Sequence, residues 1–162
     1  MKRYHLTSRK QLNLSLDYQQ KPGNLKPNGI WYSLGDEWLQ WVKSEMPSWR
    51  EKYNIEIIMS EKNLLIIDSI QRLEAFQAQY SIGREERTTL NFMMIDWESV
   101  AKKYSGIEIR DYNSIKWEYM KKEKSIYDGL WLSAWDVSSG CIWDLDKISG
   151  YTVNETPLLK DI

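Results

Sequence analysis

Three stretches of the chain show the apolar spacing of a helix with one buried face. They cover residues 36–46, 69–80 and 96–104. Each follows a residue that can cap a helix N-terminus, namely Asp36, Ser69 (or Asp68 before it) and Asp96. Pro47 ends the first stretch, because proline cannot donate a backbone hydrogen bond inside a helix. The pattern therefore predicts three helices.

Short runs rich in β-branched and aromatic residues lie before, between and after these helices and predict strands. The predicted strands are 2–6, 29–33, 55–59, 64–67, 106–110, 130–135 and 141–143. Polar stretches at 19–28, 81–89 and 121–125 predict connections. Because the order lacks regular βα alternation, we expect an α+β fold with small mixed or antiparallel sheets and three or more helices. A length of 162 residues predicts a single domain, 1–162.

The aromatic residues are unevenly chosen, with nine Trp and ten Tyr against two Phe. Trp and Tyr carry a polar atom on a large flat ring, so they suit half-wet clefts and interfaces as well as cores. The 22 basic and 23 acidic residues give a net charge of −1, which argues against binding dominated by a nucleic-acid backbone. One Cys and one His exclude two-His and multi-Cys metal sites, so we expect no metal.

The sequence lacks an apolar run near the roughly 20 residues of a membrane span. Its first ten residues, MKRYHLTSRK, lack an apolar signal core. We therefore expect a cytoplasmic protein with no membrane partner. Neither GxGxxG nor GxxxxGK[ST] occurs, so dinucleotide-binding and P-loop folds of those types are not favoured.

Two segments near the N-terminus carry candidate chemistry. The run Tyr4-His5-Leu6-Thr7-Ser8 ends a predicted strand with an imidazole and two hydroxyls, groups that can grip a ribose diol. The alternative is a plain turn. The run 26–33, KPNGIWYS, predicts a turn that leads into a short strand. Trp31 and Tyr32 lie on opposite faces of that strand, so one ring packs in the core while the other can stack on a ligand. Its alternative is a core strand.

Two later segments supply carboxylates. Glu108 lies between two Ile residues of a predicted strand, which directs it to the opposite face, toward a cleft or toward solvent. The run 131–144 holds three Trp and two Asp and predicts a hairpin turning at Ser138-Ser139-Gly140. There Asp136 is either an Asx-type cap or a polar group of a site. Cys141 is expected to be a small buried residue.

Taken together, these motifs resemble the ADP-ribosyltransferase fold, including the starts of DNA-modifying toxins and RNA 2′-phosphotransferases. Residues 4–8 resemble the first motif of that superfamily, and residues 29–33, ending in Ser33, resemble the second. Glu108 is the best match to the catalytic Glu, with Asp136 as the second choice. Trp31 departs from the usual Tyr, and the 135–143 segment lies outside the usual signature. That segment, together with the runs 26–33 (KPNGIWYS) and 104–109 (YSGIEI), also resembles a group of small phage-encoded proteins.

The resemblance implies an NAD-dependent transferase that modifies a host protein or nucleic acid. The nicotinamide–ribose bond breaks with positive charge developing on the ribose, which Glu108 would stabilise. His5 would hold a ribose hydroxyl, and Thr7 or Ser8 would assist near the amide or the phosphate. Trp31 or Tyr32 would stack on nicotinamide, and Arg3 or Arg9 would contact the pyrophosphate. The cofactor would be NAD, and the setting the host cytoplasm.

Two other functions remain open at this point. One is a non-catalytic anti-defence binding protein that blocks a host partner or sequesters a nucleotide. It is favoured if the Trp-rich segment 131–143 forms an exposed patch, because Trp is enriched at binding hot spots. The other is a nucleic-acid-binding module that stacks bases on Trp and Tyr, which the balanced charge disfavours.

Overall fold

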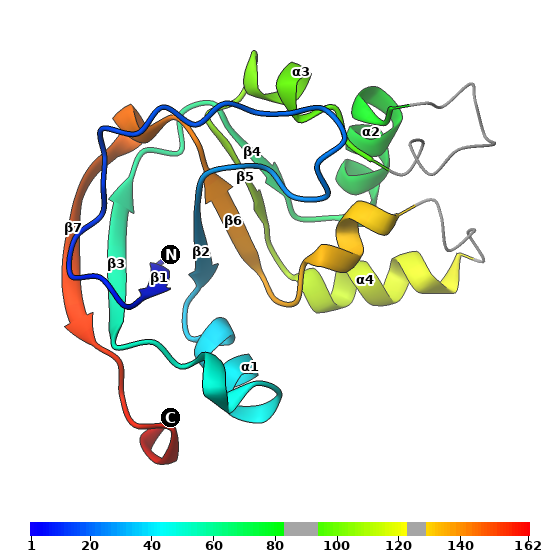
Figure 1. Cartoon of the computed structure of the whole chain (residues 1–162). Helices are drawn as coiled ribbons and strands as arrows, with labels where there is room; N and C mark the ends of the chain where they lie inside the picture. The colour runs from blue at the N-terminus through cyan, green and yellow to red at the C-terminus, as the bar shows by residue number, and fades with distance from the viewer. Residues whose placement is uncertain (83–93, 123–128) are drawn as a thin grey trace.

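A seven-stranded mixed sheet is the centre of the molecule (Figure 1). We describe it from a computed structural model, over residues 1–82, 94–122 and 129–162. The strand order is β4-β5-β6-β2-β1-β3-β7, and only the β4–β5 pair is parallel in this sheet. The strands are β1 (Arg3–Thr7), β2 (Ile30–Leu34), β3 (Tyr53–Met59), β4 (Leu64–Ile67), β5 (Gly106–Ile109), β6 (Ser139–Ile142) and β7 (Ile148–Glu155).

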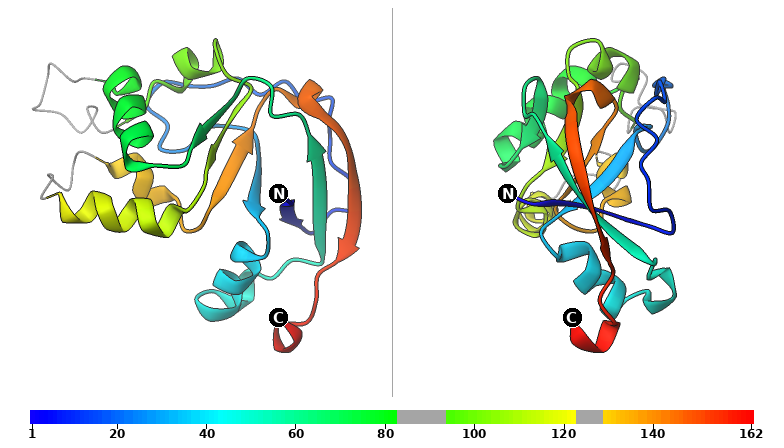
Figure 2. Two further views of the ribbon diagram at one scale, coloured as in Figure 1. Left: turned by 180° about the vertical axis from the view of Figure 1, so that it is seen from behind. Right: turned by 90° about the vertical axis from the view of Figure 1, so that its left-hand side faces the viewer.

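The α-helices of the described chain lie in two places. Those of the first group, α2 (Ile70–Tyr80), α3 (Trp97–Ala101) and α4 (Tyr112–Lys121), lie at the β4–β5 side of the sheet, whereas α1 (Glu37–Ser44) lies beyond the end of β2 (Figures 1 and 2). The shorter 3₁₀ segments are η1 (Pro47–Trp49), η3 (Leu130–Ala134), η4 (Leu145–Lys147) and η5 (Leu159–Asp161). The molecule is therefore an α+β protein, as the sequence predicts, but its strands form one seven-stranded sheet rather than the small sheets expected.

Apolar residues fill both faces of the sheet. One face packs under α2, α3, α4 and η3 around an aromatic core that includes Phe76, Trp97 and Trp131. The other face carries Tyr32, Leu34 and Ile57 and is covered by the segment between β1 and β2 and by residues near η4. In Figure 1 that segment, drawn in blue, runs across the end of the sheet before it enters β2. Both faces are thus closed without a second layer of sheet.

The three helices predicted from spacing are confirmed, with shorter bounds. Ser69 caps α2, because its side chain accepts a hydrogen bond from the backbone N–H of Arg72. Asp96 caps α3 in the same way through Ser99. Asp36 precedes α1, but its side chain forms no cap hydrogen bond. The local signals therefore located these helices, and tertiary packing set their lengths.

Two sequence predictions are wrong, and two elements were not predicted. Within the predicted strand 130–135, residues 130–134 form the 3₁₀ turn η3. Trp131 and Leu132 pack in the helical core, and Tyr112 hydrogen-bonds the carbonyls of Leu132 and Trp135. The expected hairpin at Ser138-Ser139-Gly140 is absent, since Ser139 and Gly140 belong to β6. The elements α4 and β7 were not predicted, because both carry many polar residues.

The predicted connections 81–89 and 121–125 lie largely outside the described residues, which resume at 94 and 129. The connection 19–28 is confirmed as irregular chain. Over the described residues, no helix combines the length and apolar character that crossing a bilayer would require.

Gly140 is one of several glycines at which a side chain cannot be accommodated. A Cβ there would lie 2.4 Å from the Tyr32 hydroxyl oxygen and 2.7 Å from the Ile107 carbonyl oxygen. We expect Gly140→Ala to lower the free energy of unfolding by about 1–3 kcal/mol in urea titrations, the usual cost of overpacking. Gly150→Ala, where a Cβ has no neighbour within 4 Å, is the matched control. Equal stability of the two variants would contradict this packing.

Candidate functional site

The start of β1 pairs with the end of β2, and the two strands separate beyond that point. Their register contains two pairs, Arg3 with Leu34 and Tyr4 with Ser33, whereas β1 stays paired with β3 from Arg3 to Thr7. At the point of separation, His5 Nδ1 lies 2.6 Å from the Trp31 carbonyl oxygen, so a side chain takes the place of the next backbone partner. The strands thus open into a wedge, and residues of both strand faces reach the space between them.

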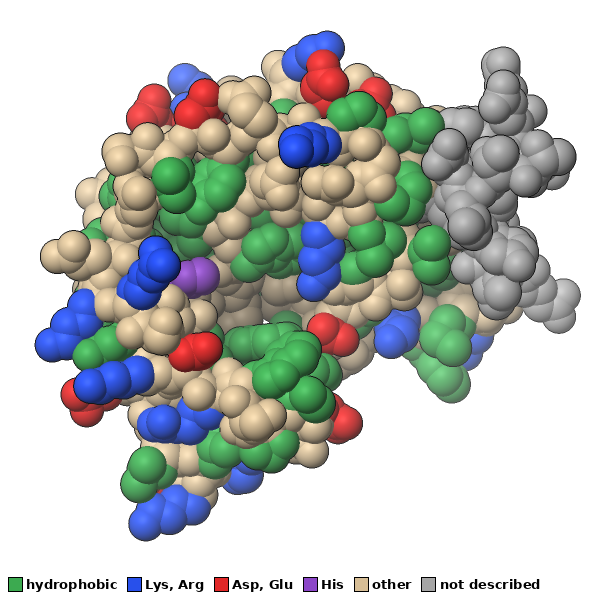
Figure 3. Space-filling model, in the orientation of Figure 1, with side chains coloured by type: hydrophobic (Ala, Val, Ile, Leu, Met, Phe, Trp, Pro, Cys, Tyr) green, Lys and Arg blue, Asp and Glu red, His purple; other side chains and the backbone are tan. Residues whose placement is uncertain are grey.

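A cleft of about 230 Å³ occupies this wedge. It is visible as a hollow in Figure 3, next to the purple His side chain. The lining comes from β1, the segment before β2, β2, α1, and the segment from η3 to β6: Tyr4, His5, Leu6, Lys26, Trp31, Tyr32, Ser33, Trp38, Ala134, Trp135, Asp136, Val137 and Ser139. Both N-terminal motifs of the sequence therefore meet Asp136 at one cleft.

The hydrogen bond of His5 fixes which ring nitrogen carries the proton in the neutral imidazole. A carbonyl oxygen only accepts, so Nδ1 carries the proton and donates it to Trp31. Burial lowers the pKa of His5 below its usual value, and the backbone hydrogen bond only partly opposes that effect. The imidazole is therefore neutral near pH 7, which leaves Nε2 as an acceptor for a hydroxyl donor.

Aromatic rings form the walls of the cleft. The rings of Trp31 and Trp135 meet edge to face, with centroids 4.8 Å apart. The ammonium of Lys26 lies 5.0 Å from the centroid of Trp31. Trp38 lines the cleft from α1 and stacks on Trp41 at 4.7 Å. Flat apolar walls of this kind suit a planar ring.

Asp136 is an exposed carboxylate on a segment that is tied down on several sides. The Tyr112 hydroxyl donates to the carbonyl of Trp135 at 2.5 Å. The backbone N–H of Ser138 donates to Glu37 Oε2 at 2.9 Å, and its carbonyl accepts from the Leu34 N–H at 3.0 Å. Asp136 is thus held in place from both sides along the chain, while its own side chain remains open to solvent.

Glu108 lies in a different environment, a fully buried ion network. Its Oε2 accepts from Arg3 Nε at 2.6 Å and from the Tyr32 hydroxyl at 2.9 Å. Its Oε1 accepts from Arg110 Nε at 2.7 Å and from Arg3 Nη2 at 3.3 Å. Both guanidinium groups also reach Glu61. The carboxylate is fully occupied by protein donors and does not line the cleft.

The network keeps its arginines charged and the Tyr32 hydroxyl neutral. Burial alone lowers the pKa of Arg3, but hydrogen bonds to Glu108 and Glu61 outweigh that effect and raise it. The hydrogen bond from Arg3 lowers the pKa of Glu61. Burial, reinforced by the charge of Glu108, raises the pKa of Tyr32 well above its usual value, so Tyr32 remains a donor. Two cations and two anions balance within the network, which makes burial of Glu108 tolerable.

The structure divides the residues predicted from the sequence into three groups. His5, Trp31, Tyr32, Ser33 and Asp136 line the cleft. Arg3 and Glu108 belong to the buried network, which Tyr32 also joins through its hydroxyl. Thr7, Ser8 and Arg9 lie outside the cleft lining, where the Thr7 hydroxyl accepts from the backbone N–H of Arg9.

Several residues that line the cleft were not predicted as site residues, and Tyr4, Trp38 and Lys26 are three of them. Tyr4 belongs to the first motif, and only its place within that motif pointed to it. Trp38 was interpreted as part of the apolar stripe of a predicted helix. That stripe was broader than the buried face of α1, where Leu39 and Val42 are the buried residues. Lys26 opens the candidate run 26–33, but no role was predicted for it, because only the folded loop places its ammonium over the Trp31 ring.

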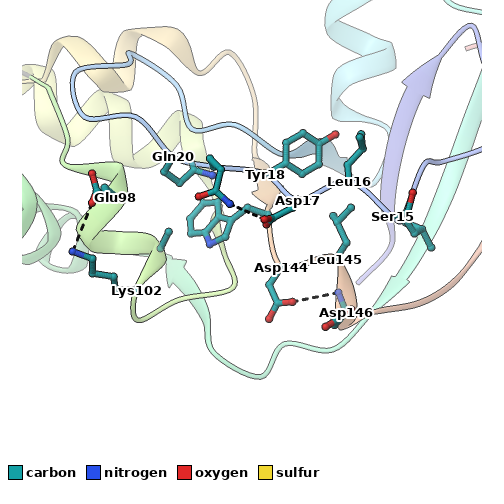
Figure 4. A pocket seen from close by; sticks show the side chains of 14 residues that line it. Ser15, Leu16, Asp17, Tyr18, Gln20, Glu98, Lys102, Asp144, Leu145 and Asp146 are labelled. Carbon is teal, nitrogen blue, oxygen red and sulfur yellow. Dashed lines mark hydrogen bonds and ion pairs between the residues drawn. The ribbon is translucent and has the colours of Figure 1, made fainter.

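A second hollow, of about 610 Å³, lies between residues 14–20, α3 and residues 143–146 (Figure 4). Its labelled acidic side chains include Asp17, Glu98, Asp144 and Asp146. Glu98 pairs with Lys102, and Asp144 accepts from the backbone N–H of Asp146. Within the described residues, His, Cys, Asp and Glu form no group of three that could hold a metal. The motif residues lie at the smaller cleft, so that cleft is the candidate site.

The chain was compared with protein-family models, with curated proteins and with solved structures, and none of them matches.

The buried network gives a stability prediction. We expect Glu108→Gln to lower the free energy of unfolding by about 3–5 kcal/mol, because Arg3 would lose its buried anionic partner and keep only the exposed Glu61. Glu98→Gln removes only a surface pair with Lys102 at 3.8 Å and should cost less than about 1 kcal/mol. Urea unfolding of the two variants measures the difference. A Glu108→Gln variant as stable as Glu98→Gln would show that the network carries little of the fold's stability.

His5 gives a pH prediction. Because its pKa is lower in the folded than in the unfolded chain, the unfolded chain binds more protons between the two values, and folding stability falls as pH drops below about 6.5. The chain has one His, so a tag-free protein gives a single imidazole resonance to titrate by NMR. We expect a midpoint below 6.5. A midpoint at or above that value would rule out the buried, neutral imidazole.

Proposed function

We propose that this chain is an NAD-dependent ADP-ribosyltransferase whose reaction centre is the cleft between β1 and β2, with Asp136 as its carboxylate. The observation that carries the proposal is the meeting of both N-terminal motifs, through His5 and Trp31, with Asp136 at one cleft. His5 and Asp136 are 131 positions apart in the sequence. Both line the space that forms where β1 separates from β2.

The size of the cleft supports binding of one end of a dinucleotide. At about 230 Å³ it is smaller than the roughly 300–1,000 Å³ of pockets that enclose a whole drug-sized ligand. A ring and its ribose would enter, and the rest of NAD would lie outside. Trp31, Trp38 and Trp135 offer flat walls for nicotinamide, whose positive ring is attracted by aromatic faces.

The neutral His5 supports binding of the ribose. Its Nε2 is available as an acceptor, so it would take a hydrogen bond from a hydroxyl of the nicotinamide ribose. Because Nδ1 is held by the Trp31 carbonyl, the ring would keep its orientation while ligand binds. Preorganised groups of this kind cost no reorganisation during reaction.

Asp136 would serve the chemical step. The bond between ribose C1″ and nicotinamide N1 breaks, its electron pair leaves with the ring, and nicotinamide departs neutral. The resulting positive charge on the ribose would be stabilised by the Asp136 carboxylate. An acceptor hydroxyl or amine then bonds to C1″, and its proton passes to Asp136 or to water. Glu108 is not given this role, since protein donors occupy both of its oxygens.

The test is nicotinamide release and label transfer from adenine-labelled NAD, with cell lysate as the source of acceptor. We expect the wild type to label a macromolecule, and Asp136→Asn to lose about 10²–10³-fold in rate, as removal of one charge-stabilising group does. Asp146→Asn, an exposed carboxylate outside the cleft, is the matched control and should retain the wild-type rate. His5→Ala should also lose activity.

Two outcomes would contradict the proposal. Turnover that survives Asp136→Asn would remove the carboxylate assignment. A folded wild type that releases no nicotinamide in lysate would favour a second function, a partner-binding protein without turnover. One observation favours that function: Trp38, Trp41 and Trp49 cluster on α1 and η1, and Trp49 is 50% exposed. The 131–143 segment supplies no such patch, because Trp131, Trp135 and Trp143 are buried.

A further inference from the structure

The cleft has an unusual charge arrangement. Of the described residues that line it, Lys26 and Asp136 are charged, while His5 is neutral near pH 7. Neither forms an ion pair with a carboxylate or a basic group in the described part of the chain. A single cation and a single anion thus stand at the same cleft without neutralising each other.

Lys26 is presented by an anchored loop. The Trp97 indole N–H donates to the Asn24 carbonyl at 3.0 Å, and the Trp31 indole N–H donates to the Pro27 carbonyl at 3.3 Å. Gln20 fixes the end of the loop, since its amide donates to the Asn28 carbonyl at 2.6 Å and accepts from the Asn28 N–H at 2.9 Å. Hydrogen bonds on both sides of Lys26 therefore hold its backbone in place.

The side chain of Lys26 is aimed along the cleft wall. Its ammonium lies over the face of Trp31, 5.0 Å from the ring centroid. The ammonium covers part of the Trp31 face, so a ligand ring that packs on that face would meet Lys26 next to it. The ammonium also has three donors, which an aromatic face does not fully use. An anionic oxygen next to the bound ring would accept a charge-assisted hydrogen bond from the Lys26 ammonium.

Arg3 and Arg9, the basic residues expected to meet a pyrophosphate, are not available at the cleft. Arg3 is committed to Glu108 and Glu61, and Arg9 does not line the cleft. Lys26 is the basic side chain among the described lining residues. A ligand phosphate at this site would therefore meet Lys26.

We infer that the cleft selects a phosphorylated pyridinium nucleoside, with Lys26 binding the phosphate next to the ribose. This inference rests on the proposed function for placing the nicotinamide end in the cleft. The opposite charges of the site match the opposite charges of such a ligand, whose ring is positive and whose phosphate is negative. The ring would lie against the Trp walls near Asp136, and the phosphate would point out past Lys26.

The test compares two probes that differ by one phosphate, nicotinamide mononucleotide and nicotinamide riboside. We expect wild-type protein to bind the mononucleotide about 10- to 100-fold more tightly in calorimetry, the range for a charge-assisted hydrogen bond. Lys26→Met should bring the two affinities together, and Lys26→Arg should preserve most of the difference. Lys21→Met, an exposed lysine of the same segment outside the cleft lining, is the control and should behave as wild type.

Three results would overturn the inference: equal wild-type affinities for the two probes, no binding of either probe, or a preference that survives Lys26→Met. The inference and the proposed function fail separately. Lys26-dependent binding without nicotinamide release from NAD would sustain the inference and refute the transferase. Transferase activity with an unchanged KM for NAD in Lys26→Met would sustain the transferase and refute the phosphate contact.

Discussion

The buried carboxylate of Glu108 connects three strands of the sheet, and the position of the cleft depends on that connection. It links β5 to β1 through Arg3 and to β2 through Tyr32, although these partners are 105 and 76 residues away in sequence. The Tyr32 ring reaches it by passing over Gly140 of β6, where a methyl group could not fit. Since a buried charge without partners is strongly destabilising, the three strands can pack only when all of these donors are in place.

The same network determines where the cleft opens. Tyr32 points to the network, so its neighbours Trp31 and Ser33 project from the other face of β2. Arg3 holds the start of β1 beside β2, and two residues later His5 ends that pairing by taking the Trp31 carbonyl. The cleft is therefore the space left when β1 continues with β3 and leaves β2. A buried ion pair thus sets the geometry of a site that it does not line.

The sequence predicted the parts of this arrangement that are local. The helix caps Ser69 and Asp96, the strands around β2 and β4, and the opposite faces of Trp31 and Tyr32 follow from spacing alone. The placement of Glu108 could not follow, because alternation gives its face but not its partners. A carboxylate between two Ile residues indicates a buried pair as readily as a cleft, and only the register of β1 with β2 and β5 with β6 decides.

The choice of Trp and Tyr over Phe has a physical explanation in the loops. Several buried rings use their polar atom to fix irregular chain: Trp97 holds Asn24, Trp143 holds Tyr104, and Tyr112 holds Trp135. Phe fills the same volume but offers no donor for such carbonyl groups. A small sheet with long connections needs these donors, because a buried backbone carbonyl left unpaired costs about 1–3 kcal/mol. The Trp and Tyr side chains that suggested a cleft therefore also stabilise the fold. The Trp residues at the cleft walls belong to the same aromatic packing that holds the loops of the protein in place.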